Sequence, residues 1–198
     1  MTLTFYDTIA GIYIRPLQMD DSHSLLDLRI RIRSVYAAFE PRQYVSFYTL
    51  HEQQQLIVRR IHEAEQDRAY MFGIFNLNGK LIGQITLSNV VRGVGQFADV
   101  GYFIDPNEKN KGYMTAALHL MLKYGFQSLG LHRIQAAILL NNQSSRRVLE
   151  KTGFQPEGIS RQLIKIDDQW QDHQTFAILV HEYTTQPIVL RKKSSTTI

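Results

Sequence analysis

Apolar and polar residues alternate along several segments of the chain, with the two-residue period of β-strands. Residues 12–16 form the first such segment. Residues 70–77 and 81–90 flank an Asn78-Gly79 step that favours a tight hairpin turn, and residues 96–105 would add a third antiparallel strand. Further strands are predicted over residues 133–140, 162–166 and 175–183.

A period of three to four residues marks the helices between these strands. Leu25, Leu28 and Ile32 follow the potential capping residues 20–22, and a second helix is predicted around residues 56–64. A third helix begins at Gly112 and ends near Gly130, and a short fourth one covers residues 144–151 and ends at Gly153. The predicted fold is therefore mixed α/β, with a largely antiparallel start.

Length and composition indicate one globular domain. Of 198 residues, 44% are hydrophobic and 20% charged, so we expect a domain over residues 1–184 and a basic tail over 185–198. The net charge is +4, but Arg191, Lys192 and Lys193 lie in that tail, so a nucleic-acid partner is not required. No leader or membrane-spanning run is apparent, and a cytoplasmic location is expected.

The absence of cysteine excludes several chemistries. A thiolate nucleophile, a disulfide framework and a cysteine-ligated metal site are all ruled out, because the chain has no Cys. His119 and His132 have no second ligand at metal spacing, so no metal site is expected.

The junction before the third helix is a candidate anion site. Gly112 can adopt backbone angles that other residues avoid, and the first N–H groups of the helix would converge on a phosphate, with Lys109 and Lys111 adding positive charge. The alternative is an ordinary turn. The candidate binding residues are Lys109, Asn110, Lys111, Gly112, Tyr113, Met114 and Thr115. Neither G-x-G-x-x-G after a strand nor G-x-x-x-x-G-K-[ST] occurs, which disfavours dinucleotide oxidoreductases and P-loop NTPases.

A second motif follows about thirty residues later. Residues 142–154 read Asn-Gln-Ser-Ser, Arg-Arg-Val-Leu, Glu-Lys-Thr-Gly-Phe, which resembles the N-x-x-S-x-x-x-x-E-K-x-G-F signature of GNAT N-acetyltransferases. The resemblance spans residues 11–184. It implies a splayed sheet of six to seven strands with about four helices, and acetyl-CoA as cofactor. It also implies that the pantetheine arm lies between strands 100–105 and 133–140 and pairs with backbone near Phe103 and Ile104.

Within that family, residues 88–93 and 166–173 are similar to the RimJ/RimL type of ribosomal-protein N-terminal acetyltransferases. This resemblance implies that the acceptor is the N-terminal α-amine of a protein or peptide, with a ribosomal protein as one candidate. Two alternatives stay open: an acetyltransferase of a small amine such as an antibiotic, polyamine or amino acid, and a non-catalytic acyl-CoA-binding or ribosome-associated module. The protein is expected to be a monomer or a homodimer.

The resemblance also suggests catalytic roles. Asn142 would hydrogen-bond the cofactor arm, although it is equally suited to cap a helix. Leu149 stands where many GNATs have a tyrosine that protonates the leaving thiolate, so Ser145 is the candidate donor to the sulfur. Glu157 is the first candidate for the base and Asp99 the second.

Two further features bear on the cleft. Met114 stands where the family pattern has Gly or Ala, which would tighten the phosphate turn. An aromatic cluster after the first helix would line the acceptor cleft in this family, and its members are Tyr36, Phe39, Tyr44, Phe47 and Tyr48.

Overall fold

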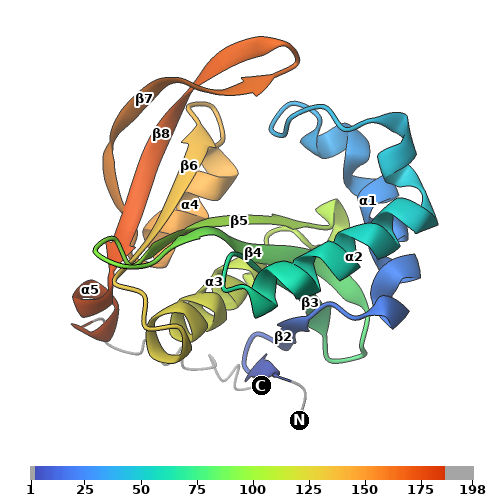
Figure 1. Ribbon diagram of the computed structural model, residues 1–198, viewed down its shortest axis with the longest axis horizontal. Helices are drawn as coiled ribbons and strands as arrows, with labels where there is room; N and C mark the ends of the chain where they lie inside the picture. Colours follow the sequence, from blue (N-terminus) through green and yellow to red (C-terminus); the bar gives the residue numbers. More distant parts are fainter. Residues whose placement is uncertain (1–2, 186–198) are drawn as a thin grey trace, which may run out of the picture.

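The strands assemble into one eight-stranded sheet in the computed structural model, which describes residues 3–185 (Figure 1). The strand order is β1-β2-β3-β4-β5-β6-β8-β7. The strands are β1 Phe5–Asp7, β2 Ile12–Pro16, β3 Tyr70–Asn76, β4 Leu81–Val91, β5 Phe97–Ile104, β6 Arg133–Leu139, β7 Gln155–Ile166 and β8 Gln169–Leu179. Of the expected tail, residues 186–198 lie outside the described residues.

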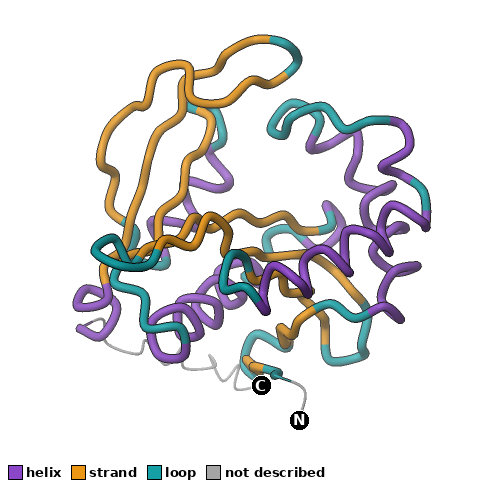
Figure 2. The backbone as a smooth tube through the Cα atoms, viewed as in Figure 1, coloured by secondary structure: helices purple, strands orange, loops and turns teal. Residues whose placement is uncertain are grey.

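Helices cover both faces of this sheet (Figures 1 and 2). They are α1 Ser22–Tyr36, α2 Leu50–Glu65, α3 Tyr113–Lys123, α4 Gln143–Lys151 and α5 Val180–Thr185. One buried cluster joins α1 and α2 to the sheet through residues such as Leu28, Ile57 and Phe103. A larger cluster joins α3 and α4 to the other face through residues such as Leu118 and Leu149. The two clusters hold the sheet between two helical layers.

The predicted hairpin at Asn78-Gly79 is confirmed. Gly79 has a φ of +80°, and the Asn76 side chain accepts hydrogen bonds from the N–H groups of Asn78 and Lys80, at 3.1 and 3.0 Å. This turn sets the antiparallel register in which Phe72 lies opposite Ile85.

The last hairpin differs from the prediction. Strand β7 begins at Gln155 rather than at residue 162, and β8 covers residues 169–179 rather than 175–183. Most of β7 is exposed and polar, and Pro156 and Gly158 interrupt its pattern, so the hydrophobic alternation that reveals a strand is missing. The turn between the strands is Asp167-Asp168, with φ of +47° and +62°, which matches the tight hairpin turns that Asp tolerates.

Strands β5 and β6 part soon after they meet. They are the parallel pair of the sheet, and their pairing extends only over Phe97, Ala98 and Asp99 opposite residues 133–135. Beyond these positions β6 turns away together with β7 and β8, as Figure 1 shows. The two strands therefore enclose a V-shaped opening whose vertex lies at Asp99. The splayed sheet that the family resemblance implied is confirmed, with eight strands instead of six to seven.

The short β1 was not predicted, nor was α5. Between α3 and β6 the chain continues as a π-helical turn, Tyr124–Ser128, and Gly130 then adopts a φ of +65°. Within residues 3–185, no helix combines the length and the apolar character needed to cross a membrane.

Candidate active site

The edge of β5 that faces the V carries backbone groups at alternate residues. The Asp105 N–H donates to the Ile82 carbonyl of β4 at 2.7 Å, and the antiparallel register places Phe103 opposite Gln84. Because hydrogen-bonded and non-hydrogen-bonded pairs alternate in such a ladder, Phe103 and Asp105 face β4. The backbone groups of Val100, Tyr102 and Ile104 face the V.

This arrangement differs from the expectation that both Phe103 and Ile104 offer free backbone. Phe103 turns its backbone toward β4, and both backbone groups of Ile104 are already bound to Tyr36 of α1. The Ile104 N–H donates to the Tyr36 hydroxyl at 3.1 Å, and that hydroxyl donates to the Ile104 carbonyl at 3.0 Å. Tyr102 is therefore the residue of this edge whose backbone lies beyond the pairing with β6 and is not bound to Tyr36.

The turn between β5 and α3 has the features of an anion site. Gly112 is the N-cap of α3 and has a φ of +81°, a left-handed conformation that favours glycine. No side chain of the described residues caps the helix, so the N–H groups of its first turn remain available. The Met114 side chain is buried in the core, away from the turn, which removes the steric concern that the sequence raised.

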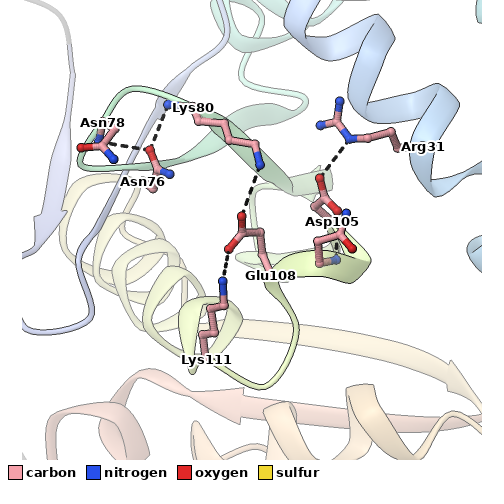
Figure 3. A network of polar contacts seen from close by, with 8 residues as sticks. Arg31, Asn76, Asn78, Lys80, Asp105, Glu108 and Lys111 are labelled. Atoms are coloured by element: carbon pink, nitrogen blue, oxygen red, sulfur yellow. Dashed lines mark hydrogen bonds and ion pairs between the residues drawn. The ribbon is translucent and has the colours of Figure 1, made fainter.

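The lysines of this turn are partly engaged by a carboxylate (Figure 3). Glu108 accepts from Lys111 at 2.7 Å and from Lys80, at the β3–β4 turn, at 3.3 Å. The hydrogen bond from Lys111, with that from Lys80 and the charge of both lysines, lowers the pKa of Glu108, and the hydrogen bond to Glu108 raises the pKa of Lys111. Lys109 lies over the Tyr36 ring, with its ammonium 5.4 Å from the centroid. An incoming anion would therefore compete with Glu108 for positive charge.

The first turn of α4 contributes polar groups from the opposite arm of the V. Asn142 is the N-cap, and its Oδ1 accepts from the Ser145 N–H at 3.1 Å and from the Ser144 hydroxyl at 3.0 Å. Among the described residues its amide nitrogen has no partner, so the capping role leaves a donor for a ligand. Tyr102 reaches across from β5 and donates to the Ser145 carbonyl at 3.4 Å.

A row of polar side chains crosses four strands at the closed end of the V, where β5 and β6 are still paired. Asp99 of β5 accepts from Asn89 of β4 and from Gln135 of β6, both at 2.7 Å. The Arg133 Nε donates to the Gln135 Oε1 at 3.0 Å. Arg133 also forms a two-pronged ion pair with Glu157 of β7, in which Nη1 lies 2.6 Å from Oε1 and Nη2 contacts Oε2. We call this chain of five residues the polar row.

The polar row contains both candidate bases, but their environments differ. Hydrogen bonds and charge from Arg133 lower the pKa of Glu157, because both carboxylate oxygens are engaged by the guanidinium. A carboxylate held in this way is a poor proton acceptor. The two partners of Asp99 are neutral amides, and Asp99 lies where β5 and β6 separate. The geometry thus favours Asp99 over Glu157 for contact with a reacting group.

A cavity of about 200 Å³ lies beside the same face of β5, between α1, the α1–α2 connection and the β7–β8 turn. Three of the five predicted cleft aromatics line it, namely Tyr36, Phe47 and Tyr48, whereas Phe39 and Tyr44 do not. Its walls also carry three arginines, Arg29, Arg33 and Arg42. We call this cavity the arginine pocket.

Several of these residues were not found from the sequence. Gln135 was one polar residue in an otherwise apolar strand, between the buried Ile134 and Ala136, and this was the available signal. Arg133 and Tyr102 gave no comparable signal, because their roles depend on pairing between strands. Asn89 was noted only as part of the RimJ/RimL-like segment 88–93. Within the described part of the chain, no group of three His, Asp or Glu side chains is arranged to hold a metal ion.

Comparison with known proteins adds to this geometry. Residues 12–155 match the family model described as an acetyltransferase (GNAT) domain. The chain is 41% identical over 169 residues to the probable N-acetyltransferase YjcK of Bacillus subtilis, covering 85% of this chain and 93% of the relative. It is 31% identical over 180 residues to the ribosomal protein uS5-alanine N-acetyltransferase of Escherichia coli, covering 89% and 92%.

Solved structures agree with the sequence relatives. The RimJ protein of Mycobacterium smegmatis, solved in complex with CoA-disulfide, superimposes with a TM-score of 0.82. It shares 28% sequence identity, and the match covers 88% of this chain and 89% of that one. The similarity therefore extends over the sheet and both helical layers.

Proposed function

The chain belongs to the GNAT family of acetyltransferases, and from this premise we propose that it transfers acetyl from acetyl-CoA to the N-terminal α-amine of a protein. The observation that carries the proposal is the separation of β5 and β6 at Asp99, with the uncapped N-terminus of α3 at the other end of the same β5 edge. The relative that acetylates ribosomal protein uS5 supports a protein acceptor.

The residues present fit coenzyme A. The first-turn N–H groups of α3, together with Lys109 and Lys111, suit a pyrophosphate. The backbone of Tyr102 offers hydrogen bonds along the V, as a strand edge does to a peptide. When bound, acetyl-CoA supplies the acetyl group as an activated thioester.

We assign the roles of the side chains from their positions. Asp99 takes the proton of the attacking amine, directly or through water, because it is a carboxylate at the vertex of the V whose hydrogen-bond partners are two neutral amides. Gln135 and Asn89 hold it in place. Asn142 donates its amide N–H to the cofactor arm, and the Ser145 hydroxyl donates to the leaving sulfur from the α4 side.

The acceptor enters from the α1 and α2 face. Asp99 and Gln135 face this side, because the alternating residues Ala98 and Ile134 are buried against α3. Sites for whole small molecules usually measure about 300–1,000 Å³, so the 200 Å³ arginine pocket is suited to part of a larger acceptor. Its arginines also disfavour a polyamine, because like charges repel.

An acceptor panel tests this function. We would incubate the protein with acetyl-CoA and peptides that carry a free α-amine, peptides with a blocked N-terminus and an internal lysine, free amino acids, or polyamines. Mass spectrometry locates the acetyl group, and a thiol assay follows turnover. We expect acetylation of free α-amines of peptides. Turnover with polyamines or free amino acids alone would replace the proposal by a small-amine activity, and cofactor binding without turnover would favour a non-catalytic module.

A further inference from the structure

The arginine pocket holds more positive charge than its own residues neutralise. Arg29 is nearly buried, with 13% of its side chain exposed, and its nearest carboxylate is Glu40, with the Nη1 and Oε2 atoms 3.8 Å apart. That separation is too long for a hydrogen bond. Its Nη2 donates to Gln84 at 3.1 Å, but within residues 3–185 its buried Nε has no hydrogen-bond partner. A buried donor without a partner is costly, which indicates a role for it.

Arg33 extends this surplus to the mouth of the pocket. Its guanidinium lies 4.5 Å from the centroid of the Tyr48 ring, and among the described residues it forms no ion pair. Arg29 is likewise packed over the Phe103 ring at 4.2 Å. Aromatic faces orient a guanidinium while leaving its N–H donors free. Arg29 and Arg33 therefore both offer N–H donors to the arginine pocket.

Glu40 does not neutralise the arginines of the pocket by itself. It is half-buried, and burial raises its pKa, an effect that the charge of Arg29 only partly offsets. Burial in turn lowers the pKa of Arg29. Both directions indicate that these charges lack the contacts that would compensate for their burial. A carboxylate that reached hydrogen-bond distance would supply them, because guanidinium and carboxylate match in geometry.

We propose that the arginine pocket binds the side-chain carboxylate of an acidic residue near the N-terminus of the acceptor, through Arg29 and Arg33. The inference rests on the proposed function for the identity of the acceptor. Arg29 packs on Phe103, which precedes Ile104 at the wide end of the V, while Asp99 lies at its vertex. An acceptor whose amine reaches Asp99 would thus place a following side chain in the pocket.

Paired peptides provide the test. Each pair is identical except for Glu or Gln at a single position from 2 to 6, and both members carry a free N-terminal amine. We would measure kcat/KM for acetylation, and also the affinity of each peptide for the protein with coenzyme A but without acetyl-CoA, by fluorescence anisotropy. At one position we expect the Glu peptide to exceed the Gln peptide about tenfold in both measurements, as for a charge-assisted hydrogen bond.

Variants identify the residues responsible. Arg33→Gln is expected to bring the Glu-to-Gln ratio close to one, and Arg33→Glu to favour Lys at that position. Arg33 is exposed, so these variants should fold. Arg29→Lys, which keeps the charge but loses the planar fork, should reduce the ratio if a thermal melt shows that it folds. The control is Arg59→Gln, an exposed arginine of α2 outside the pocket, which should leave ratio and turnover unchanged.

The outcomes separate the two proposals. A wild-type ratio near one at every position, or a ratio that persists in Arg33→Gln, would overturn the acidic preference while leaving α-amine acetylation intact. If no peptide is acetylated, the proposed function fails, and the anisotropy ratio still decides the pocket. Turnover of free Glu but not of peptides would assign the pocket to a small acceptor and overturn the inference as stated.

Discussion

The proposed anion-binding turn comes from consecutive residues, 109–115, whereas the polar row takes five side chains from four strands. The turn would bind an anion through backbone N–H groups whose direction is fixed once Gly112 adopts its left-handed conformation. The polar row depends on which strands become neighbours and in what register. One change of the backbone can therefore alter the turn. In the polar row, the loss of one side chain is distributed over several hydrogen-bond partners.

The largest expected effect lies in the polar row, at Asp99. Asp99→Asn should lower kcat/KM about 100-fold, the lower end of what a general base contributes, because an amide cannot take the proton of the amine. Affinity for coenzyme A, measured by calorimetry, should change less than twofold. Asp27→Asn, at an exposed position of α1, is the control and should retain full activity. A loss smaller than threefold at Asp99 would remove it from the mechanism.

A second change tests whether the turn is as local as the comparison assumes. Gly112→Ala and Gly130→Ala both place a Cβ on a left-handed residue, with φ of +81° and +65°, and each should lower the free energy of unfolding by about 1–2 kcal/mol. Only Gly112→Ala should weaken coenzyme A binding, by about tenfold in Kd, because the helix N–H groups no longer converge. Gly112→Asn should restore part of the affinity, since Asn tolerates this conformation. Equal affinities in the two alanine variants would contradict an anion site at this turn.

The same comparison explains what could be predicted from sequence. The strands β2 to β6, the helices α1 to α4 and the Gly112 turn follow from periodicity and from glycine, which are local properties. The extent of β7 was missed, because an exposed edge strand with Pro156 and Gly158 has no apolar face to reveal it. The pairing of Glu157 with Arg133 was missed for a different reason, since the two residues are 24 positions apart and meet only after β8 is inserted between their strands.

Substitution of the two acids of the polar row, Asp99 and Glu157, should lower activity to different extents. Glu157→Gln is expected to lower kcat only about threefold, because Glu157 touches Arg133 and acts on Asp99 only through Arg133 and Gln135. The pH profile separates positioning from chemistry: the acidic limb of kcat/KM, where a general base becomes protonated, should keep its shape in Glu157→Gln and change in Asp99→Asn. A 100-fold loss in Glu157→Gln would instead restore it as the base.

The ion pair of Glu157 also gives a dependence of stability on pH. Arg133 lowers the folded-state pKa of Glu157 below its ordinary value of 4.5. A lowered carboxylate pKa contributes stability above the unfolded pKa, and that contribution is lost as the pH falls through the folded value. The difference in unfolding free energy between wild type and Glu157→Gln should therefore be constant from about pH 7 to 5.5 and shrink below about pH 4.5. Urea denaturation at each pH measures it, and a difference that grows on acidification would contradict the pair.

The smallest effect concerns Glu108, the acidic residue that directly precedes the anion-binding turn. Glu108 competes with a phosphate for Lys111 and Lys80, so Glu108→Gln should tighten coenzyme A binding about two- to threefold, within the range of an exposed ion pair. Glu63→Gln removes a carboxylate from a pair of the same spacing, Arg60–Glu63 on α2, and controls for net charge. The gain should fade in high salt, because exposed charges are screened. Weaker binding in Glu108→Gln would mean that Glu108 supports the turn by holding the lysines in place. The turn would then also depend on the contact between Glu108 and Lys80 of the β3–β4 hairpin.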